Sequence, residues 1–186
     1  MDASQYRTLN FKPLKEEDLP VLYAWLQAKH VREFYHRKTV PSWKEMHAEY
    51  IQRLDPDWPT RCFFSYSGVT PLGYIQTYRV EDYPEYGAMI GEDKGISLDL
   101  FIGDAALIGK GWGRLILLKF LRDVAFPMFC EEHVCWIYHD KQNHRALCAS
   151  RAAGFRHVRS FTEDGDLKEL LALNRDEVSS CNISSR

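Results

Sequence analysis

The sequence of 186 residues has no long apolar run, no paired cysteine motif and no strong net charge. Without an apolar run of membrane-spanning length, we expect no transmembrane helix and no membrane partner. Residues 1–7 lack the apolar core and cleavage site of a signal peptide, which predicts a cytoplasmic protein. The formal net charge of -2 gives no general electrostatic reason to bind nucleic acid.

The five cysteines include no Cys-x-x-Cys pair, and an odd number favours reduced thiols over a disulfide framework. Cys130, His133 and Cys135 lie close together in the sequence, but no second ligand pair with zinc-like spacing follows. We therefore expect no metal site. The remaining histidines are scattered, and no Cys-His or Ser-His motif supports a hydrolase.

The composition, 45% apolar and 27% charged, is typical of a globular protein. The length predicts one domain over residues 1–186, with its core in residues 8–173 and a frayed tail at 179–186. Alternating or dense apolar patterns predict strands at 8–14, 62–66, 72–80, 96–102, 134–138, 155–161 and 167–173. Helical spacing and capping residues predict helices at 19–26, 42–54, 111–126 and 143–153. Glycines at 87, 91 and 95 predict a loop at 81–95.

The sequence Ile-Gly-Lys-Gly-Trp-Gly at 108–113 follows an apolar strand and opens a predicted helix. A helix N-terminus presents unpaired N–H groups and a partial positive charge, and glycine lets a ligand approach the backbone closely. Lys110 and Arg114 add positive charge. A Walker loop requires Ser or Thr after Gly-Lys, whereas Gly111 follows here, and the glycine spacing differs from a dinucleotide fingerprint. The turn therefore predicts a diphosphate site; the alternative is a turn that only connects strand to helix.

Three segments, 107–118, Asn-His-Arg-Ala-Leu at 143–147 and Ala-Gly-Phe at 153–155, resemble the Gcn5-related N-acetyltransferase (GNAT) superfamily. Within it, residues 97–113 resemble the aminoglycoside 6′-N-acetyltransferases, and the resemblance covers residues 8–173. It implies an α+β fold: a twisted, mixed, mostly antiparallel sheet of about seven strands, splayed between two central parallel strands, 96–102 and 134–138. About four helices would cover both faces.

The resemblance also implies acetyl-CoA as the donor, lying in the split of the sheet. Backbone groups of Leu100, Phe101 and Ile102 would pair with its pantetheine arm, and Asn143 and Ala146 would touch it. The residues implied around its pyrophosphate are Ile108, Gly109, Lys110, Gly111, Trp112, Gly113 and Arg114. The family usually has Arg or Gln in place of Ile108, so backbone amides would carry that contact.

Acyl transfer to an amine requires a proton acceptor for the amine and stabilisation of the departing thiolate. Asp99 lies inside an apolar strand, where an ionised carboxylate is costly unless it has a partner. It aligns with the aspartate that holds the reactive ammonium in the aminoglycoside enzymes; the alternative is a side chain that only faces solvent. Ser150 stands where many members have the tyrosine that protonates the thiolate, and Tyr138, a neighbouring residue or water can replace it.

By the same resemblance, Phe34, Tyr35, Tyr78, Asp99 and Tyr138 are expected to contact the acceptor. The negative charge of the loop at 81–95 adds Asp82 as a candidate that attracts the amine; the alternative is a solvated loop. Tyr138 and His139 stand where the aminoglycoside enzymes often have Asp and Pro. These features predict a ternary-complex acetyltransferase, a monomer or homodimer, for an aminoglycoside 6′-amine or a similar small polyamine-like substrate. The alternatives are another amine, such as a siderophore precursor, polyamine or protein amine, or a non-catalytic CoA-binding module.

Overall fold

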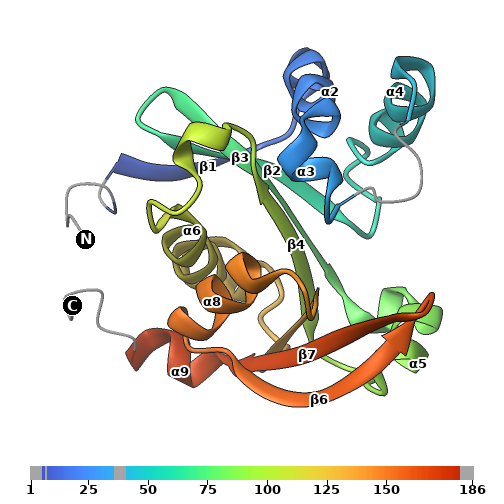
Figure 1. The fold of residues 1–186 in the computed structure, drawn as a ribbon, viewed down its shortest axis with the longest axis vertical. Coiled ribbons are helices and arrows are strands. Elements are labelled where there is room, and N and C mark those ends of the chain that lie inside the picture. Colours follow the sequence, from blue (N-terminus) through green and yellow to red (C-terminus); the bar gives the residue numbers. More distant parts are fainter. Residues whose placement is uncertain (1–5, 7, 36–40, 181–186) are drawn as a thin grey trace.

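The computed structural model describes residues 6, 8–35 and 41–180 (Figure 1). A seven-stranded sheet has the order β1-β2-β3-β4-β5-β7-β6. The strands are β1 Leu9–Pro13, β2 Arg61–Ser67, β3 Thr70–Arg79, β4 Ile96–Ile102, β5 Val134–Asp140, β6 Arg156–Glu163 and β7 Asp166–Asn174. Each was predicted from its apolar pattern to within a few residues. The tight β6–β7 turn uses positive φ angles at Asp164 and Gly165, 52° and 86°.

The sheet divides at its centre, between β4 and β5. Among the described strands these two form the one parallel pair, and their pairing covers only Ile96 with Cys135 and Ser97 with Trp136. Beyond Ser97 the strands separate, and Figure 1 shows β4 running away from the β6–β7 hairpin. The expected sheet, splayed between two central parallel strands, is confirmed.

Four helices of nine or ten residues match the predicted ones: α2 Leu19–Gln27, α4 Trp43–Gln52, α6 Trp112–Phe120 and α8 His144–Ala152. Ser42 caps α4 as expected, because its hydroxyl accepts from the Glu45 N–H and the Glu45 carboxylate accepts from the Ser42 N–H. The shorter helices are α3 Lys29–Arg32, α5 Pro84–Ile90, α7 Phe126–Met128 and α9 Arg175–Ser180. Single turns are η1 Glu16–Asp18, η2 Val80–Asp82, η3 Ala105–Leu107 and the π-helical η4 Leu121–Ala125.

The prediction of a loop at 81–95 was wrong, because η2 and α5 occupy much of it. Pro84 stands at the start of α5, and Gly91 ends the helix in a left-handed conformation with φ 70°. Both residues are ordinary helix boundaries, so Gly87 inside the helix misled the interpretation. The predicted helix at 111–126 is divided, since α6 gives way to the π turn η4. Residues 179 and 180 belong to α9 rather than to a tail, and 181–186 lie outside the described part.

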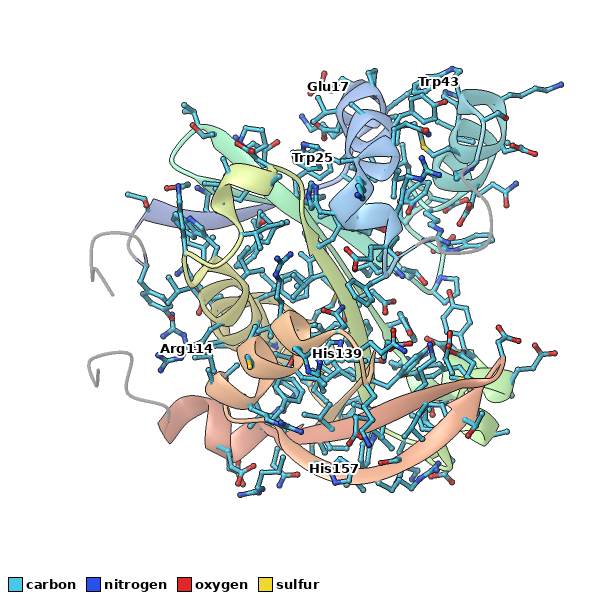
Figure 2. The ribbon with its side chains drawn as sticks, viewed as in Figure 1. Glu17, Trp25, Trp43, Arg114, His139 and His157 are labelled. Atoms are coloured by element: carbon cyan, nitrogen blue, oxygen red, sulfur yellow. The ribbon has the colours of Figure 1, made fainter. Side chains whose placement is uncertain are left out.

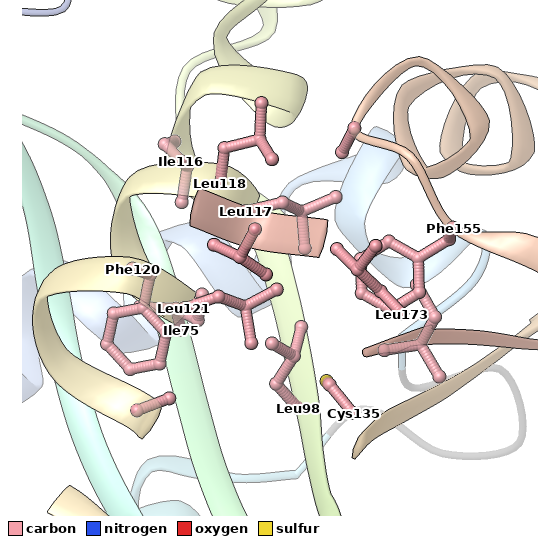
Figure 3. Packing of buried hydrophobic residues seen from close by; sticks show 14 of the residues in the cluster. Ile75, Leu98, Ile116, Leu117, Leu118, Phe120, Leu121, Cys135, Phe155 and Leu173 are labelled. Atoms are coloured by element: carbon pink, nitrogen blue, oxygen red, sulfur yellow. The ribbon is translucent and has the colours of Figure 1, made fainter. Parts of the chain in front are cut away.

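One face of the sheet carries a continuous hydrophobic core. Inward residues of β1 to β5 and β7 pack against α6, η4 and α8 in a single cluster, the α6 face cluster. Figure 3 shows Leu117 and Leu121 of this layer above Leu98 of β4 and Cys135 of β5. Because side chains alternate along a strand, Ile137 joins the same face as Cys135.

The opposite face carries two separate clusters. Phe101 of β4 packs with α2, α3 and α4 in one of them, the α2–α4 cluster. Val80, Ile90 and Leu170 form the other, the α5 cluster, with Trp136 and Tyr138 against it. Asp99 points to this face, two residues from Phe101 and two from Ser97, whose hydroxyl bonds Tyr86 of α5. The carboxylate therefore lies between the two clusters. In residues 8–35 and 41–180, no helix is long and apolar enough to cross a membrane.

Candidate active site

A cavity of about 1140 Å³ lies in the split of the sheet. Its walls come from α3, α4, β4, the turn before α6, β5, α8 and the β6–β7 turn. Figure 2 labels two of its lining side chains, Arg114 on α6 and His139 on β5. The cavity joins the glycine turn at one end to Asp99 at the other. Segments far apart in the sequence are thus brought into a single site.

The glycine turn forms one end of this cavity. Gly109 and Gly111 have φ angles of 77° and 82°, in the left-handed region that favours glycine. Gly111 is the N-cap residue of α6 and has no side chain to accept a hydrogen bond from the first turn. The first N–H groups of the helix therefore face the cavity end without a capping side chain. A Cβ on Gly113 would lie 3.3 Å from the Cβ of Ala149, so this glycine permits close packing of α6 against α8.

These features suit a phosphate. Around Gly109 a Cβ would have no heavy atom within 4 Å, so the turn has open space in front of it. Uncapped N–H groups, the helix dipole and the Arg114 side chain in the cavity wall all favour an anion there. Of the seven residues expected around a pyrophosphate, Lys110 is exposed and does not line the cavity, and the other six do. Trp112 lines it but packs in the α6 face cluster.

The edge of β4 forms the middle of the cavity wall. Because the pairing with β5 ends at Ser97, none of the described strands lies beside this edge of β4 from Leu98 to Ile102. Leu100, Phe101 and Ile102 line the cavity as expected, but their contributions differ. The ring of Phe101 stacks on Tyr74 at 5.5 Å in the α2–α4 cluster, and the Ile102 carbonyl accepts a 2.9 Å hydrogen bond from the His30 ring. The Gly103 N–H donates to the Leu72 carbonyl, so alternation along the strand turns the Phe101 backbone groups to β3 and the Leu100 groups to the open edge. An extended arm would therefore find backbone groups mainly at Leu100.

Asn143 and Ala146 lie at the start of α8, also in the cavity wall. The Asn143 side-chain oxygen accepts from the Ala146 N–H at 3.2 Å and so caps the helix. The sequence analysis assigned Asn143 only to the cofactor. Its side-chain oxygen is engaged in this cap within α8.

Asp99 is held by a chain of side chains that the sequence analysis missed. The Gln76 amide nitrogen donates to the Asp99 carboxylate at 2.8 Å. The Gln76 amide oxygen accepts from Arg53 at 2.7 Å and from the Tyr74 hydroxyl at 2.6 Å, so the amide cannot turn its oxygen toward Asp99. Arg53 in turn pairs with Glu49, one helical turn earlier on α4. Asp99 thus has a partner inside the apolar strand and does not simply face solvent.

Burial raises the pKa of Asp99 above its ordinary value, which makes the carboxylate a stronger base. The hydrogen bond from Gln76 and the charge of Arg53 act in the opposite direction. The balance leaves a carboxylate that is half-buried, oriented by Gln76 and more basic than an exposed aspartate. Such a group can take a proton from an amine that enters the cavity.

The residues expected to hold the acceptor are divided by the structure. Phe34 and Tyr35 follow α3 and line the cavity with Asp99, and Tyr35 packs edge-on against Phe101 at 4.9 Å. Tyr78 lines a second cavity of about 280 Å³, where it packs against Tyr83 at 5.0 Å. Its side chain also hydrogen-bonds Asp99, which acts against the effect of burial on the pKa of that carboxyl. Asp82 lines neither of these cavities, and its carboxylate is engaged by Arg79 at 3.0 and 3.2 Å. The expectation that Asp82 contacts the substrate is not supported by this placement.

Tyr138 and Ser150, the two candidates for assisting the thiolate, lie on β5 and α8 in the cavity wall. The Tyr138 hydroxyl donates to Glu163 at 3.2 Å. Burial and the nearby charge of Glu163 raise the pKa of Tyr138 well above its ordinary value, which makes it a poor proton source. Ser150 is buried, and its hydroxyl lies 2.8 Å from the Nε2 atom of His139.

The β6–β7 turn supplies acidic side chains that the sequence analysis did not assign. Glu163, Asp164 and Asp166 line the cavity near Tyr138. Lys168 also lines it, but its ammonium lies 3.3 Å from Asp140 and 3.6 Å from Glu163. The turn therefore gives the cavity an acidic rim. No cluster of metal-ligating side chains occurs among the described residues.

The family model for the acetyltransferase (GNAT) domain matches residues 15–162, and the chain therefore belongs to the GNAT acetyltransferase family. The expectation of an acyltransferase from this family is confirmed, and acetyl-CoA is the donor that the family uses. Among curated proteins, the chain is 23% identical over 159 residues to the aminoglycoside N(6′)-acetyltransferases type 1 of Klebsiella pneumoniae and Serratia marcescens. Each match covers 83% of this chain and 77% of the relative.

Solved structures share the fold. The aminoglycoside acetyltransferase AAC(6′)-Ib in complex with ribostamycin and coenzyme A superposes with a TM-score of 0.78 at 19% identity, covering 96% of this chain and 99% of the other. Spermidine N-acetyltransferase from Vibrio cholerae, in complex with CoA and spermine, gives a TM-score of 0.76 at 13% identity, covering 93% and 99%. At these identities the likeness establishes the fold, and the acceptor has to be argued from the site.

Proposed function

We propose that this protein transfers an acetyl group from acetyl-CoA to a primary amine of a small cationic molecule, in the first place the 6′-amine of an aminoglycoside. The observation that carries the proposal is the position of Asp99. Its carboxylate lies in the split of the sheet, in the same cavity as the glycine turn, and Gln76 orients it. The curated relatives named for aminoglycoside acetylation support this choice of acceptor.

The donor would lie with its pyrophosphate at the first turn of α6, held by the N–H groups of Gly109, Gly111 and Gly113. Arg114 would add a charged contact, and the open edge of β4 near Leu100 would pair with the pantetheine arm. When bound, acetyl-CoA supplies an activated thioester carbonyl at the split between β4 and β5. The amine would approach from the opposite face, where Asp99 lies between the two clusters.

In the reaction, Asp99 binds the ammonium form of the acceptor and accepts its proton, directly or through water. The neutral nitrogen then attacks the thioester carbon. The second N–H proton, released on amide formation, goes to water, or to Asp99 once the first proton has passed from Asp99 to water. The raised pKa of Asp99 favours this transfer, since a carboxylate closer in basicity to the amine takes the proton more readily. Both substrates have to be present together, because the protein supplies no covalent acyl carrier in this scheme.

Charge in the cavity favours a polycationic acceptor. Glu163, Asp164 and Asp166 on the β6–β7 turn add negative charge to the cavity that Asp99 lines. Of the cations in the wall, Arg53 is paired with Glu49, and Lys168 lies near Asp140, Glu163 and Asp166. Arg114 of α6 and Arg145 of α8 also line the cavity, so six carboxylates face four cations. An acceptor with several ammonium groups would gain from this rim, whereas an anionic acceptor would be repelled.

A polyamine is the second candidate acceptor. The structure of spermidine N-acetyltransferase shares the fold over 93% of this chain. A linear polyamine also offers several ammonium groups to the acidic rim. It lacks the rings and hydroxyls of an aminoglycoside, so the two candidates are separated by a direct comparison of acceptors.

The test is a panel of acceptors with acetyl-CoA, followed by release of the free coenzyme A thiol. We expect turnover with ribostamycin and kanamycin and none with an aminoglycoside that carries a hydroxyl in place of its 6′-amine. Asp99→Asn should lower kcat by about 10²–10⁴-fold, the usual contribution of a general base, while acetyl-CoA binding stays within about twofold. Turnover only with spermidine or spermine would favour the second candidate. Coenzyme binding without turnover of any amine would reject the proposal in favour of a binding module.

A further inference from the structure

His139 and Ser150 form a buried polar pair on the α6 face of the sheet. His139 lies two residues beyond Ile137 on β5, so its side chain points to the same face as Cys135 and Ile137 in the α6 face cluster. Ser150 faces it from α8, with Nε2 and Oγ 2.8 Å apart, and is 1% exposed. Asp99 points to the other face. The cavity therefore has a hydroxyl-imidazole pair on one side of the split and a carboxylate on the other.

The glycine turn is on the same side as this pair. Gly113 packs against Ala149, the neighbour of Ser150 on α8. A donor held at the turn would therefore enter the split from the α6 face, and its thioester sulfur would lie on the side of α8. The acyl carbon has to reach an amine held by Asp99 on the opposite face. Consequently the sulfur lies nearer to Ser150 than to Asp99 when the carbon–sulfur bond breaks.

The state of His139 decides what the pair can donate. Burial lowers the pKa of His139 to about 4, so the ring is neutral at neutral pH. A neutral imidazole has one N–H. When Nε2 carries the hydrogen, it donates to the Ser150 oxygen, and the serine hydrogen is directed elsewhere. When Nδ1 carries it, the serine hydroxyl donates to Nε2 and has nothing left for a ligand.

We propose that His139, in its Nε2–H form, orients the Ser150 hydroxyl toward the thioester sulfur, and that this hydroxyl stabilises the departing thiolate by a hydrogen bond. The inference rests on the proposed function, and it makes Ser150 the catalytic residue and His139 a positioning residue. As the carbon–nitrogen bond forms, the carbon–sulfur bond breaks and its electron pair goes to sulfur. Asp99 or water takes the proton from nitrogen. The thiolate leaves hydrogen-bonded to Ser150 and takes its proton from water afterwards.

This assignment explains why the pair can be neutral. A full proton transfer from Ser150 would leave an alkoxide beside a neutral imidazole, which burial disfavours. A hydrogen bond to a thiolate requires no such charge, and hydrogen bonds to ionised groups are the stronger ones. The Tyr138 hydroxyl is engaged by Glu163 and does not compete for this role.

The experiment measures the pKa of the coenzyme A thiol in its complex with the intact protein, so it needs no acceptor. The thiolate is followed by its ultraviolet absorbance across a pH titration, and the complex with desulfo-coenzyme A is subtracted to remove the protein's own cysteines. In the wild type we expect the bound thiol to have a lower pKa than in Ser150→Ala, by about one pH unit, which is a tenfold change in ionisation. His139→Leu should raise it similarly, and His139→Gln, which keeps an N–H donor, should restore it in part.

Ser97→Ala is the matched control, because it removes another buried hydroxyl, one that bonds Tyr86 and the Trp136 carbonyl instead. It should leave the pKa of the bound thiol unchanged. The His139 variants keep the test decisive if Ser150→Ala does not fold. An equal thiol pKa in the wild type and in His139→Leu, with coenzyme A bound to both, would overturn the role of the pair and leave the proposed function intact. Failure of the wild type to bind coenzyme A would overturn both.

Discussion

The two ends of the cavity are built in different ways. The donor end consists mainly of backbone: a turn of glycines, the uncapped N-terminus of α6 and the open edge of β4. The acceptor end consists of side chains from α4, β3, β4 and the β6–β7 turn, with Asp99 at its centre. A backbone site recognises a phosphate in much the same way whatever side chains surround it. A side-chain site depends on each partner, so the two ends should respond separately to substitution.

The largest effect is expected from a substitution at the donor end, which tests whether the two ends respond separately. Gly111→Asp places a carboxylate at the N-terminus of α6, where it would repel a pyrophosphate and block its approach. We expect acetyl-CoA to bind on the order of a hundredfold more weakly, about 2.7 kcal/mol, in isothermal calorimetry. Gly68→Asp is the control, because Gly68 has a similar φ of 61° in the exposed β2–β3 turn. Unchanged acetyl-CoA affinity in Gly111→Asp would remove the glycine turn from the donor site.

At the acceptor end the largest effect short of Asp99 itself is expected at Gln76. Gln76→Met keeps the length of the side chain but removes the donor to Asp99, and we expect kcat/KM to fall about tenfold. Loss of this hydrogen bond raises the pKa of Asp99 further. Activity requires the ionised carboxylate and is lost as pH falls through that pKa, so the acid limb of the pH profile should begin at a higher pH than in the wild type.

Gln52→Met serves as the control for Gln76→Met, since Gln52 lies nearby on α4 and lines only the second cavity. Acetyl-CoA affinity should stay the same in both variants. A Gln76→Met enzyme with an unshifted acid limb would show that Gln76 does not tune Asp99. A weakened donor affinity would contradict the separation of the two ends.

The smallest effect is expected at the acidic rim. Glu163 is partly exposed, so removing its charge with Glu163→Gln should raise KM for a cationic acceptor only about two- to fivefold. The difference should shrink at high salt, because exposed charges are screened. The exposed Glu131→Gln, outside the cavity, is the matched control. An equal KM in both variants, or a difference that persists at high salt, would argue against an electrostatic role of the rim.

The same contrast decided what the sequence could predict. The glycine turn is a run of neighbouring residues, so its geometry was accessible from local rules, and so were the Ser42 cap of α4 and the period of β4. The chain from Glu49 through Arg53 and Gln76 to Asp99 depends on contacts between α4, β3 and β4, and no local pattern marks those residues as partners. Asp82 illustrates the converse. Its charge suggested a substrate contact, but Arg79, three residues earlier, already engages it.

The brief pairing of β4 with β5 has a consequence for how the molecule opens. Because two residue pairs join the halves β1–β4 and β5–β7 within the sheet, cohesion there depends mainly on the α6 face cluster. Regions joined by few backbone hydrogen bonds can exchange their amide hydrogens as separate cooperative units. An acyl donor lying along the free edge of β4 would occupy the place of the missing strand. The bound donor would then also connect the two halves of the sheet. Amide hydrogen exchange at the β4–β5 junction should therefore be slower when the donor is bound.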